Sequence, residues 1–435
     1  MSWLANIAYL IAAAAYLPVL VYQMVFQHKN RRGWREKLLG PRFLQPLLQP
    51  RRRFWLHGVS LGEINAARQL VARLDAHSDD HDLVVSSTTD TGHARACQLY
   101  GPDRVFRYPL DFGWAVSRAL RRIDPTLIVL VELEVWFNLV TMAKRRKVPV
   151  CVVNGRLTER SCRRLRLLGP LCGRMFRALR WVGAQDEATA RRFVSLGVPA
   201  DRVAVTGSVK WDTATVADRV EGQDELAAAL GIDPHRPLWV CGSTGPAEES
   251  LLLDAFERLR AEHADLQLAL VPRKPERFDE VADMITRRAY SLRRRSRLPD
   301  GEKATSTSDD RPTVLLGDTM GELRKFYALA TVVFVGRSLV PMGGSDPMEV
   351  AALGKPIIVG PHMDNFAAPT RALEADGALC TARNVHELEQ ELMRFLRHAD
   401  IAHESGTAGQ QVVRAHQGAT ERTVQTLLEV MSNAP

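Results

Sequence analysis

The sequence places a glutamate where an apolar run gives way to a helical pattern. Glu63 ends the segment GVSLGE (residues 58–63), in which two glycines turn the chain. A carboxylate in the first turn of a helix stabilises the helix N-terminus through the helix dipole. The same carboxylate at the end of a strand can act as a general base. The residue types leave both roles open for Glu63.

Two more carboxylates and a lysine have comparable positions. Glu132 and Glu134 follow the apolar run 127–131, and strand alternation puts both on one face, with Leu133 on the other. Lys210 comes just after another apolar run. Charged side chains at the end of a buried strand need an ionic partner or a functional reason. We therefore expect either a structural Glu–Lys ion pair or a polar site at this edge of the predicted sheet.

The second half contains a candidate phosphate site. In the segment GGSDPME (residues 343–349), two glycines precede Asp346, Pro347 and Glu349. Such a segment is typical of a helix start with free backbone N–H groups, which suits an anion. The same residues are also typical of a helix cap with a structural role alone. Arg273, at the end of another apolar run, would add a cation.

Short apolar runs alternate with helical patterns along most of the chain. This alternation is typical of parallel sheets covered by helices on both faces. We expect strands over residues 54–59, 83–86, 127–131, 148–153 and 203–206, and again over 238–241, 266–271, 313–316, 331–335 and 356–359.

A chain of 435 residues exceeds one compact core, so two domains are expected. The polar segment 213–237 is the predicted linker between residues 29–212 and 238–435. Two doubly wound α/β domains would bind ligands in a cleft at the carboxyl ends of their strands. Neither half has a G-x-G-x-x-G after its first strand or a G-x-x-x-x-G-K-[ST]. This argues against a dehydrogenase and a P-loop NTPase.

Residues 1–28 are the predicted membrane anchor. The segment Trp3–Phe26 carries no charge and is long enough to cross a bilayer. A basic segment follows from Lys29 to Lys37. The positive-inside bias then places the rest of the chain in the cytoplasm, on the inner membrane. A cleaved signal peptide fits poorly, because no basic residue precedes the run. A core helix and an interfacial helix remain open.

The formal net charge of +8 indicates an anionic partner. Basic residues concentrate in 29–53 and 144–180, and each one near an anionic leaflet contributes about 1 kcal/mol. We expect the first half to lie against an anionic membrane surface, and no nucleic acid as a partner, because no nucleic-acid module is recognisable. The six cysteines form no C-x-x-C pair or Cys/His cluster, so no metal site is expected.

Several segments in order resemble those of the Kdo transferases, which attach 3-deoxy-D-manno-octulosonic acid (Kdo) to lipid A precursors. The segments are HGVSLGE (57–63), VELEVW (131–136), NGRLTERS (154–161), VTGSVKWD (205–212), VPRKPERF (271–278), GDTMGEL (317–323) and GRSLVPMGGSDPMEVAALGKPIIVGPHMDNF (336–366). The resemblance implies a GT-B fold of two Rossmann-like domains. It also implies inverting transfer from CMP-Kdo to a lipid A precursor (lipid IVA), with no metal or cofactor, at the cytoplasmic membrane face in lipopolysaccharide core biosynthesis.

The resemblance also implies roles for individual residues. Glu63 would be the general base, and Glu132 and Lys210 would stabilise the transition state. The CMP moiety would be held by Pro272, Arg273, Met320, Gly321, Glu322, Asp346, Pro347, Met348 and Glu349.

Two other functions compete with this one. The first is a GT-B membrane glycosyltransferase that uses a different nucleotide sugar, which competition by CMP against UDP would distinguish. The second is a non-catalytic anchored protein that binds anionic lipid through its basic face. That protein would keep its function after Glu63→Ala.

Overall fold

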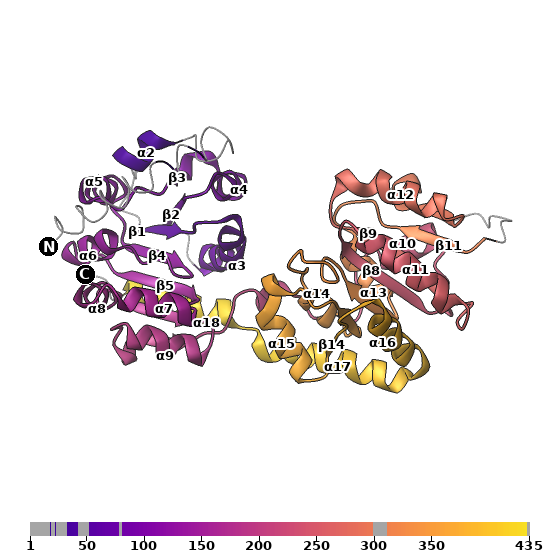
Figure 1. The fold of residues 1–435 in the computed structure, drawn as a ribbon. Coiled ribbons are helices and arrows are strands. Elements are labelled where there is room, and N and C mark those ends of the chain that lie inside the picture. The colour runs from indigo at the N-terminus through magenta and orange to yellow at the C-terminus, as the bar shows by residue number, and fades with distance from the viewer. Residues whose placement is uncertain are drawn as a thin grey trace. The chain divides into compact units, whose positions relative to one another are not determined.

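The computed structural model describes residues 18, 22, 33–41, 52–77, 81–298 and 311–432. It divides the chain into two compact units (Figure 1): Met1–Thr213 with His416–Pro435, and Ala214–Ala415. Within the described ranges, no helix combines the length and apolar composition needed to cross a membrane. The predicted anchor over residues 1–28 lies outside these ranges, apart from Pro18 and Tyr22.

The first unit is built on a parallel sheet of order β3-β2-β1-β4-β5-β6-β7. Its strands are β1 (Arg52–His57), β2 (His81–Ser87), β3 (Val105–Arg107), β4 (Leu127–Val131), β5 (Val150–Gly155), β6 (Trp181–Ala184) and β7 (Val203–Val205). Its helices are α2 (Trp34–Leu39), α3 (Leu61–His77), α4 (Asp90–Tyr100), α5 (Gly113–Ile123), α6 (Phe137–Arg145), α7 (Glu159–Arg166), α8 (Pro170–Phe176), α9 (Glu187–Ser195) and α18 (Ala419–Ser432).

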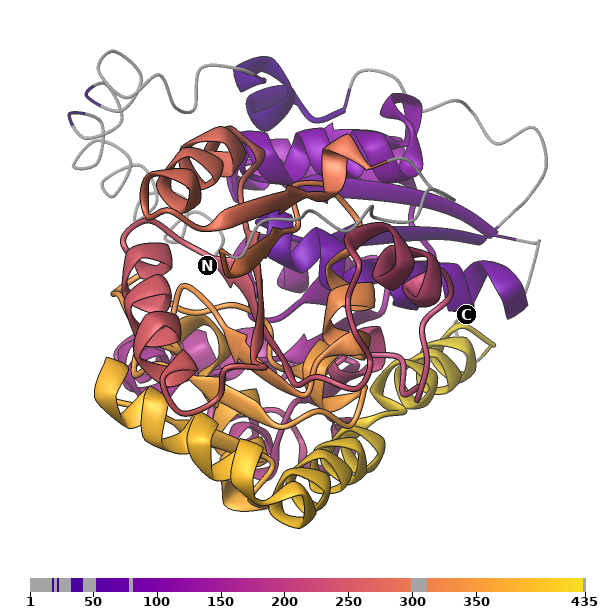
Figure 2. The same ribbon diagram turned by 90° about the vertical axis from the view of Figure 1, so that its right-hand side faces the viewer.

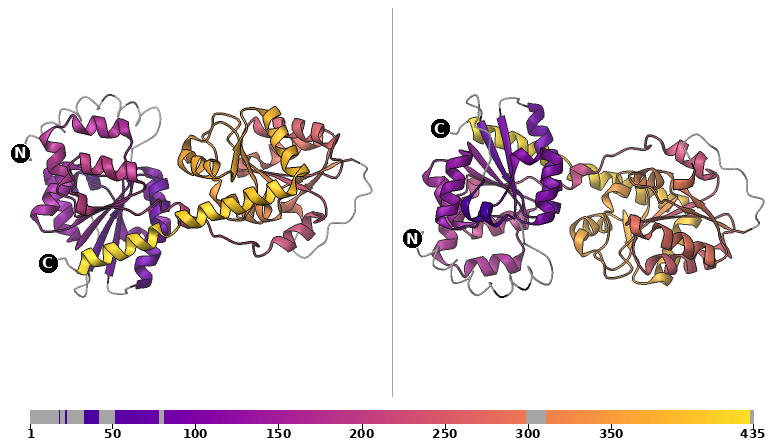
Figure 3. Two further views of the ribbon diagram at one scale, coloured as in Figure 1. Left: turned by 90° about the horizontal axis from the view of Figure 1, so that it is seen from below. Right: turned by 90° about the horizontal axis from the view of Figure 1, so that it is seen from above.

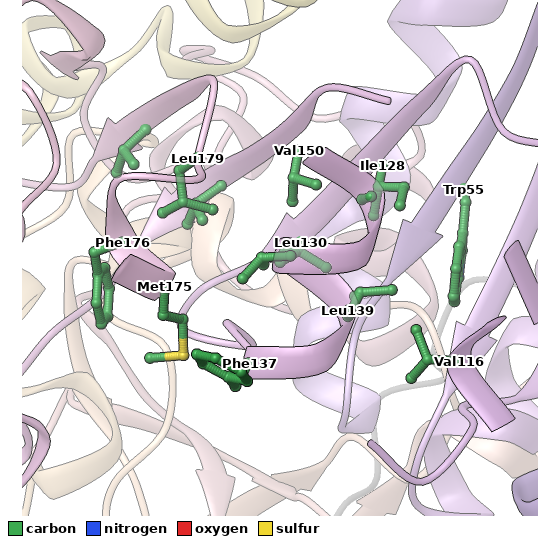
Figure 4. Close-up of a cluster of buried hydrophobic side chains, with 14 of the residues drawn as sticks. Trp55, Val116, Ile128, Leu130, Phe137, Leu139, Val150, Met175, Phe176 and Leu179 are labelled. Atoms are coloured by element: carbon green, nitrogen blue, oxygen red, sulfur yellow. The ribbon is translucent and has the colours of Figure 1, made fainter. Parts of the chain in front are cut away.

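Apolar side chains cover both faces of this sheet and form a core on each. Every residue of β4 is buried, as expected for a parallel strand with helices on both sides. Figure 4 shows the core on one face, which includes Trp55, Leu130 and Phe137. Ile64 and Leu70 of α3 belong to the core on the other face.

The second unit has a parallel sheet of order β10-β11-β9-β8-β12-β13-β14. Its strands are β8 (Leu238–Thr244), β9 (Gln267–Pro272), β10 (Ser291–Arg294), β11 (Thr313–Leu316), β12 (Val332–Val335), β13 (Ile357–Val359) and β14 (Leu379–Thr381). Its helices are α10 (Gln223–Leu230), α11 (Glu248–Arg260), α12 (Phe278–Arg287), α13 (Leu323–Leu329), α14 (Met348–Ala351), α15 (Ala367–Ala375), α16 (Val385–Arg397) and α17 (Ala399–His416).

The domain boundaries differ from the predicted ones at the C-terminus. The predicted second domain ran to residue 435, but α18 packs against α3 in the first unit (Figure 3). Val424 and Leu427 of α18 lie in the same core as Ile64. Gly418, between α17 and α18 (the yellow helices in Figure 2), has φ +90°, and its N–H donates to Asp212 Oδ1 at 2.7 Å.

The predicted linker 213–237 also differs, because it is partly helical. It contains α10, whose Leu226 and Leu230 are buried and which packs against α13. Its polar and proline-containing flanks concealed a short amphipathic helix.

Each sheet has a switch point, where the chain reverses its direction of winding. In the first unit it lies between β1 and β4, and in the second between β8 and β12. Ligands of doubly wound sheets bind at the carboxyl ends of the strands beside this point. The loops after these four strands are therefore the expected ligand-binding positions.

Candidate active site

Glu63 lies at the switch point of the first unit, in the first turn of α3 after β1. Its Oε2 accepts from the Val59 N–H at 2.8 Å, and its Oε1 accepts from the Ser60 hydroxyl at 2.9 Å. These contacts realise the capping role. A carboxylate has about four lone-pair positions, so its oxygens can accept further hydrogen bonds. The structure orients Glu63 firmly and leaves it half-buried.

Glu132 is the first residue after β4 and has φ +62°. A non-glycine residue in this left-handed region costs about 1–2 kcal/mol. This left-handed turn begins directly after β4, beside the switch point. Burial raises the pKa of the Glu132 carboxyl, the nearby Glu63 raises it further, and Lys210 and Arg156 lower it. The structure thus brings together the three residues for which a catalytic role was predicted.

Glu134, which the sequence placed beside Glu132 without a role, belongs to the same group. Burial raises the pKa of Glu134 to about 7, and the charge of Glu63 contributes to the rise. The Trp136 indole N–H donates to its Oε2 at 3.0 Å and opposes the rise. We call Glu63, Glu132, Glu134 and Lys210 the carboxylate cluster.

Lys210 follows β7, which lies three strands from β4 in the sheet order. Asn154 is buried at the end of β5 and has φ +51°. Its side chain holds the segment that precedes Lys210. Its Oδ1 accepts from the Val209 N–H at 3.3 Å and from Gln185 Nε2 at 3.0 Å. In the sequence, this asparagine stands out only as the first residue of the segment NGRLTERS (154–161). Its role depends on two contacts, 31 and 55 residues away in the chain, that no local pattern reveals.

The second unit has a cavity of about 370 Å³ at its own switch point. Small-molecule sites commonly range from about 300 to 1,000 Å³. Three residues of the predicted CMP set line it, namely Arg273, Asp346 and Glu349. The other lining residues are Ser243, Leu323, Tyr327, Arg337, Gly344, Ser345, Asn365 and Phe366.

The carboxylates of this cavity have different surroundings. Asp346 Oδ1 accepts from the Met348 N–H at 2.8 Å, so it caps α14, a helix of only four residues. Burial raises the pKa of Glu349, while Arg324 and Arg273 lower it. Glu349 thus interacts electrostatically with two arginines, whereas Asp346 has a hydrogen bond to the backbone of α14.

Tyr327 forms part of the cavity wall and was missed at the sequence level. It is fully buried, its hydroxyl hydrogen-bonds Ser243, and burial raises its pKa. A Cβ at Gly242 would lie 2.3 Å from its ring, so the glycine permits its position. A tyrosine beside Phe326 and Leu329 in α13 looks like an ordinary core residue in the sequence.

Glu248 fixes the loops that form this switch point. Its carboxylate is fully buried and accepts from the N–H groups of Gly245 (2.9 Å), Ser338 (2.7 Å) and Leu339 (2.9 Å), and also of Arg337. It therefore ties the loop after β8 to the loop after β12.

The remaining members of the predicted CMP set lie outside the cavity lining: Pro272, Met320, Gly321, Glu322, Pro347 and Met348. Met320 is 71% exposed, whereas Met348 is buried. Burial would raise the pKa of Glu322, but hydrogen bonds from Arg295 and Thr319 hold it below its usual value. A contact of these six residues with CMP stays a prediction.

The chain is similar to proteins of one known family over most of its length. Residues 30–213 match the family described as 3-deoxy-D-manno-octulosonic-acid transferase (kdotransferase). The 3-deoxy-D-manno-octulosonic acid transferase of Haemophilus influenzae is 32% identical over 381 residues, covering 87% of each chain. That of Bordetella pertussis is 32% identical over 428 residues, covering 94% of this chain and 96% of the relative.

Solved structures support the fold alone. A glycosyltransferase from Rickettsia africae is 10% identical with a TM-score of 0.55, covering 88% of this chain and 100% of its own. MurG from Acinetobacter baumannii is 14% identical with a TM-score of 0.53, covering 87% and 100%. The prediction of two parallel α/β domains resembling GT-B glycosyltransferases is confirmed.

Proposed function

The chain belongs to the family of Kdo transferases, and we propose that it transfers Kdo from CMP-Kdo to the hydroxyl of a lipid A precursor, with inversion. The observation that carries the proposal is the carboxylate cluster at the β1/β4 switch point. A glycosyl transfer needs a group that accepts the proton of the acceptor hydroxyl and groups that stabilise developing charge. Glu63, Glu132 and Lys210 supply both kinds.

Glu63 accepts the proton of the acceptor hydroxyl in this proposal. The hydroxyl oxygen then forms a bond to the anomeric carbon of Kdo, and the bond from that carbon to the CMP phosphate oxygen breaks. The contacts of Glu63 with Val59 and Ser60 fix its orientation, which favours attack in a productive geometry. The proton leaves with Glu63, and the electron pair of the broken bond leaves with CMP.

Glu132 and Lys210 stabilise the charges that develop during this step. Positive character grows on the sugar, where the Glu132 carboxylate is favourable, and negative charge grows on the departing phosphate, where Lys210 is favourable. The charge of Lys210 lowers the pKa of Glu132, which supports their action as one group.

The donor binds in the cavity of the second unit. Arg273 offers a guanidinium to the phosphate, and Glu349 accepts from ribose hydroxyls. The further contacts of CMP in this proposal are Pro272, Met320, Gly321, Glu322, Asp346, Pro347 and Met348.

The acceptor, lipid IVA, lies in the cytoplasmic leaflet of the inner membrane, where residues 1–28 anchor the chain. The turn between α7 and α8 supports a membrane contact: Leu167 is 86% exposed and Leu168 is 49% exposed. Arg163, Arg164 and Arg166 precede this turn in α7. Apolar tips beside basic side chains are suited to an anionic interface.

A competition experiment tests the donor. Membranes carrying the wild-type chain are supplied with freshly generated CMP-Kdo and a tetra-acylated lipid A precursor, with CMP or UDP as competitor. Inhibition by CMP and not by UDP is expected. Inhibition by UDP alone, or a product from another nucleotide sugar only, would instead support the competing glycosyltransferase.

A further inference from the structure

Arg337 occupies a backbone position that disfavours a side chain. It follows β12 and has φ +59°. The buried Glu248 imposes this conformation, because its carboxylate accepts from the N–H groups of Arg337, Ser338 and Leu339 in succession. Glycine adopts this region without strain, whereas an L side chain is strained there. The hydrogen bonds of Glu248 therefore hold an arginine at a backbone position that strains its side chain.

The loop after β8 leaves room for the Arg337 side chain. A Cβ at Gly245 would lie 3.1 Å from Arg337 Cγ and 2.8 Å from Met342 Sδ. One guanidinium nitrogen of Arg337, Nη2, donates to the Met342 carbonyl at 3.3 Å. Its Nε is buried and has no hydrogen-bond partner among the described residues. A buried guanidinium nitrogen without an acceptor is costly, and an anionic ligand at this guanidinium would offset that cost.

Arg337 lines the same cavity as Arg273. Two guanidinium groups at one cavity repel each other, and an anion between them removes that repulsion. Of the two carboxylates there, Asp346 accepts from the Met348 N–H, and Glu349 interacts electrostatically with Arg273. A ligand with more than one negative charge would interact favourably with both guanidinium groups.

We propose that Arg337 is an anion-binding residue of the donor cavity, where it and Arg273 neutralise the two acidic groups of a nucleotide-activated sugar acid, the phosphate and the sugar carboxylate. The inference rests on the proposed function. It assigns the donor a second cationic contact outside the predicted CMP set.

Arg337→Gly tests this assignment. Glycine suits the backbone there, so the variant should fold with a melting temperature at or above that of the wild type. CMP affinity is measured by calorimetry and the KM for CMP-Kdo by transfer assay. Loss of a charged hydrogen bond should weaken one or both by about 10- to 100-fold, with little change in kcat. Arg383→Gly, at an exposed arginine outside the cavity lining, is the matched control and should change neither.

Comparing CMP with CMP-Kdo shows which acidic group of the donor Arg337 contacts. Weakening of both CMP and CMP-Kdo places Arg337 on the phosphate, and weakening of CMP-Kdo alone places it on the sugar carboxylate. Unchanged values for both ligands in a folded Arg337→Gly variant overturn the inference while leaving the proposed function intact. A wild type that binds no CMP overturns the proposed donor and this inference with it.

Discussion

At the residue scale, Glu134 is the carboxyl of the cluster whose pKa has the largest shift, to about 7. An unfolded glutamate releases its proton near 4.5. The folded state holds more protons between these values, so the free energy of unfolding falls as the pH rises from about 4.5 to 7. This loss is complete above pH 7.

Glu134→Gln should remove this pH dependence. Relative to wild type, the variant's free energy of unfolding should be higher at pH 8 than at pH 5 by on the order of 1–3 kcal/mol. The Trp136 indole can still donate to the glutamine oxygen. Denaturant unfolding at both pH values measures the difference. An equal effect at pH 5 and pH 8 would show that Glu134 does not titrate in this range.

Asn154 is predicted to position Lys210. Asn154→Gly tolerates φ +51° but removes the acceptor for the Val209 N–H. We expect kcat to fall by about 10- to 100-fold through misplacement of Lys210. CMP affinity should change less than kcat, because the residues that line the CMP cavity lie in the other unit. An unchanged kcat, or a parallel loss of CMP affinity, would contradict a positioning role.

At the scale of elements, α18 tests the division of the chain. Leu427 of α18 and Leu392 of α16 are both fully buried, one in each unit. Leucine-to-alanine changes in a core cost about 2–5 kcal/mol. Leu427→Ala should speed hydrogen exchange in α3 and leave β8 protected, and Leu392→Ala should do the reverse. Faster exchange in β8 after Leu427→Ala would contradict the assignment of α18 to the first unit.

The elements also show how far the sequence could predict the fold. β4 matches its predicted range, 127–131, because five consecutive apolar residues between turns have few other structures available. α18 could not be assigned, because an amphipathic helix specifies an apolar face and not the sheet that it covers. The positions of Glu63 and Glu132 after their strands could be predicted, because strand ends are visible in the sequence. The roles of Asn154 and Tyr327 could not, because distant contacts define them.

At the scale of the whole molecule, donor binding and chemistry are assigned to different units. Arg273→Ala should therefore weaken CMP binding and raise the KM for CMP-Kdo. Lys210→Ala should lower kcat by about 100- to 1,000-fold, with a smaller loss of CMP affinity than Arg273→Ala causes. Calorimetry with CMP and steady-state transfer kinetics separate the two effects. A loss of CMP affinity in Lys210→Ala as large as that in Arg273→Ala would contradict this division of roles.

The most direct test of the central claim is transfer from CMP-Kdo to the lipid A precursor by Glu63→Gln. Glutamine at this position preserves the helix cap, so the fold and the CMP affinity should match those of the wild type. The glutamine amide cannot accept the proton of the acceptor hydroxyl. We predict a fall in kcat of about 100-fold or more. Wild-type kcat in the folded Glu63→Gln variant would contradict the account, because the proton of the acceptor would then leave by another route.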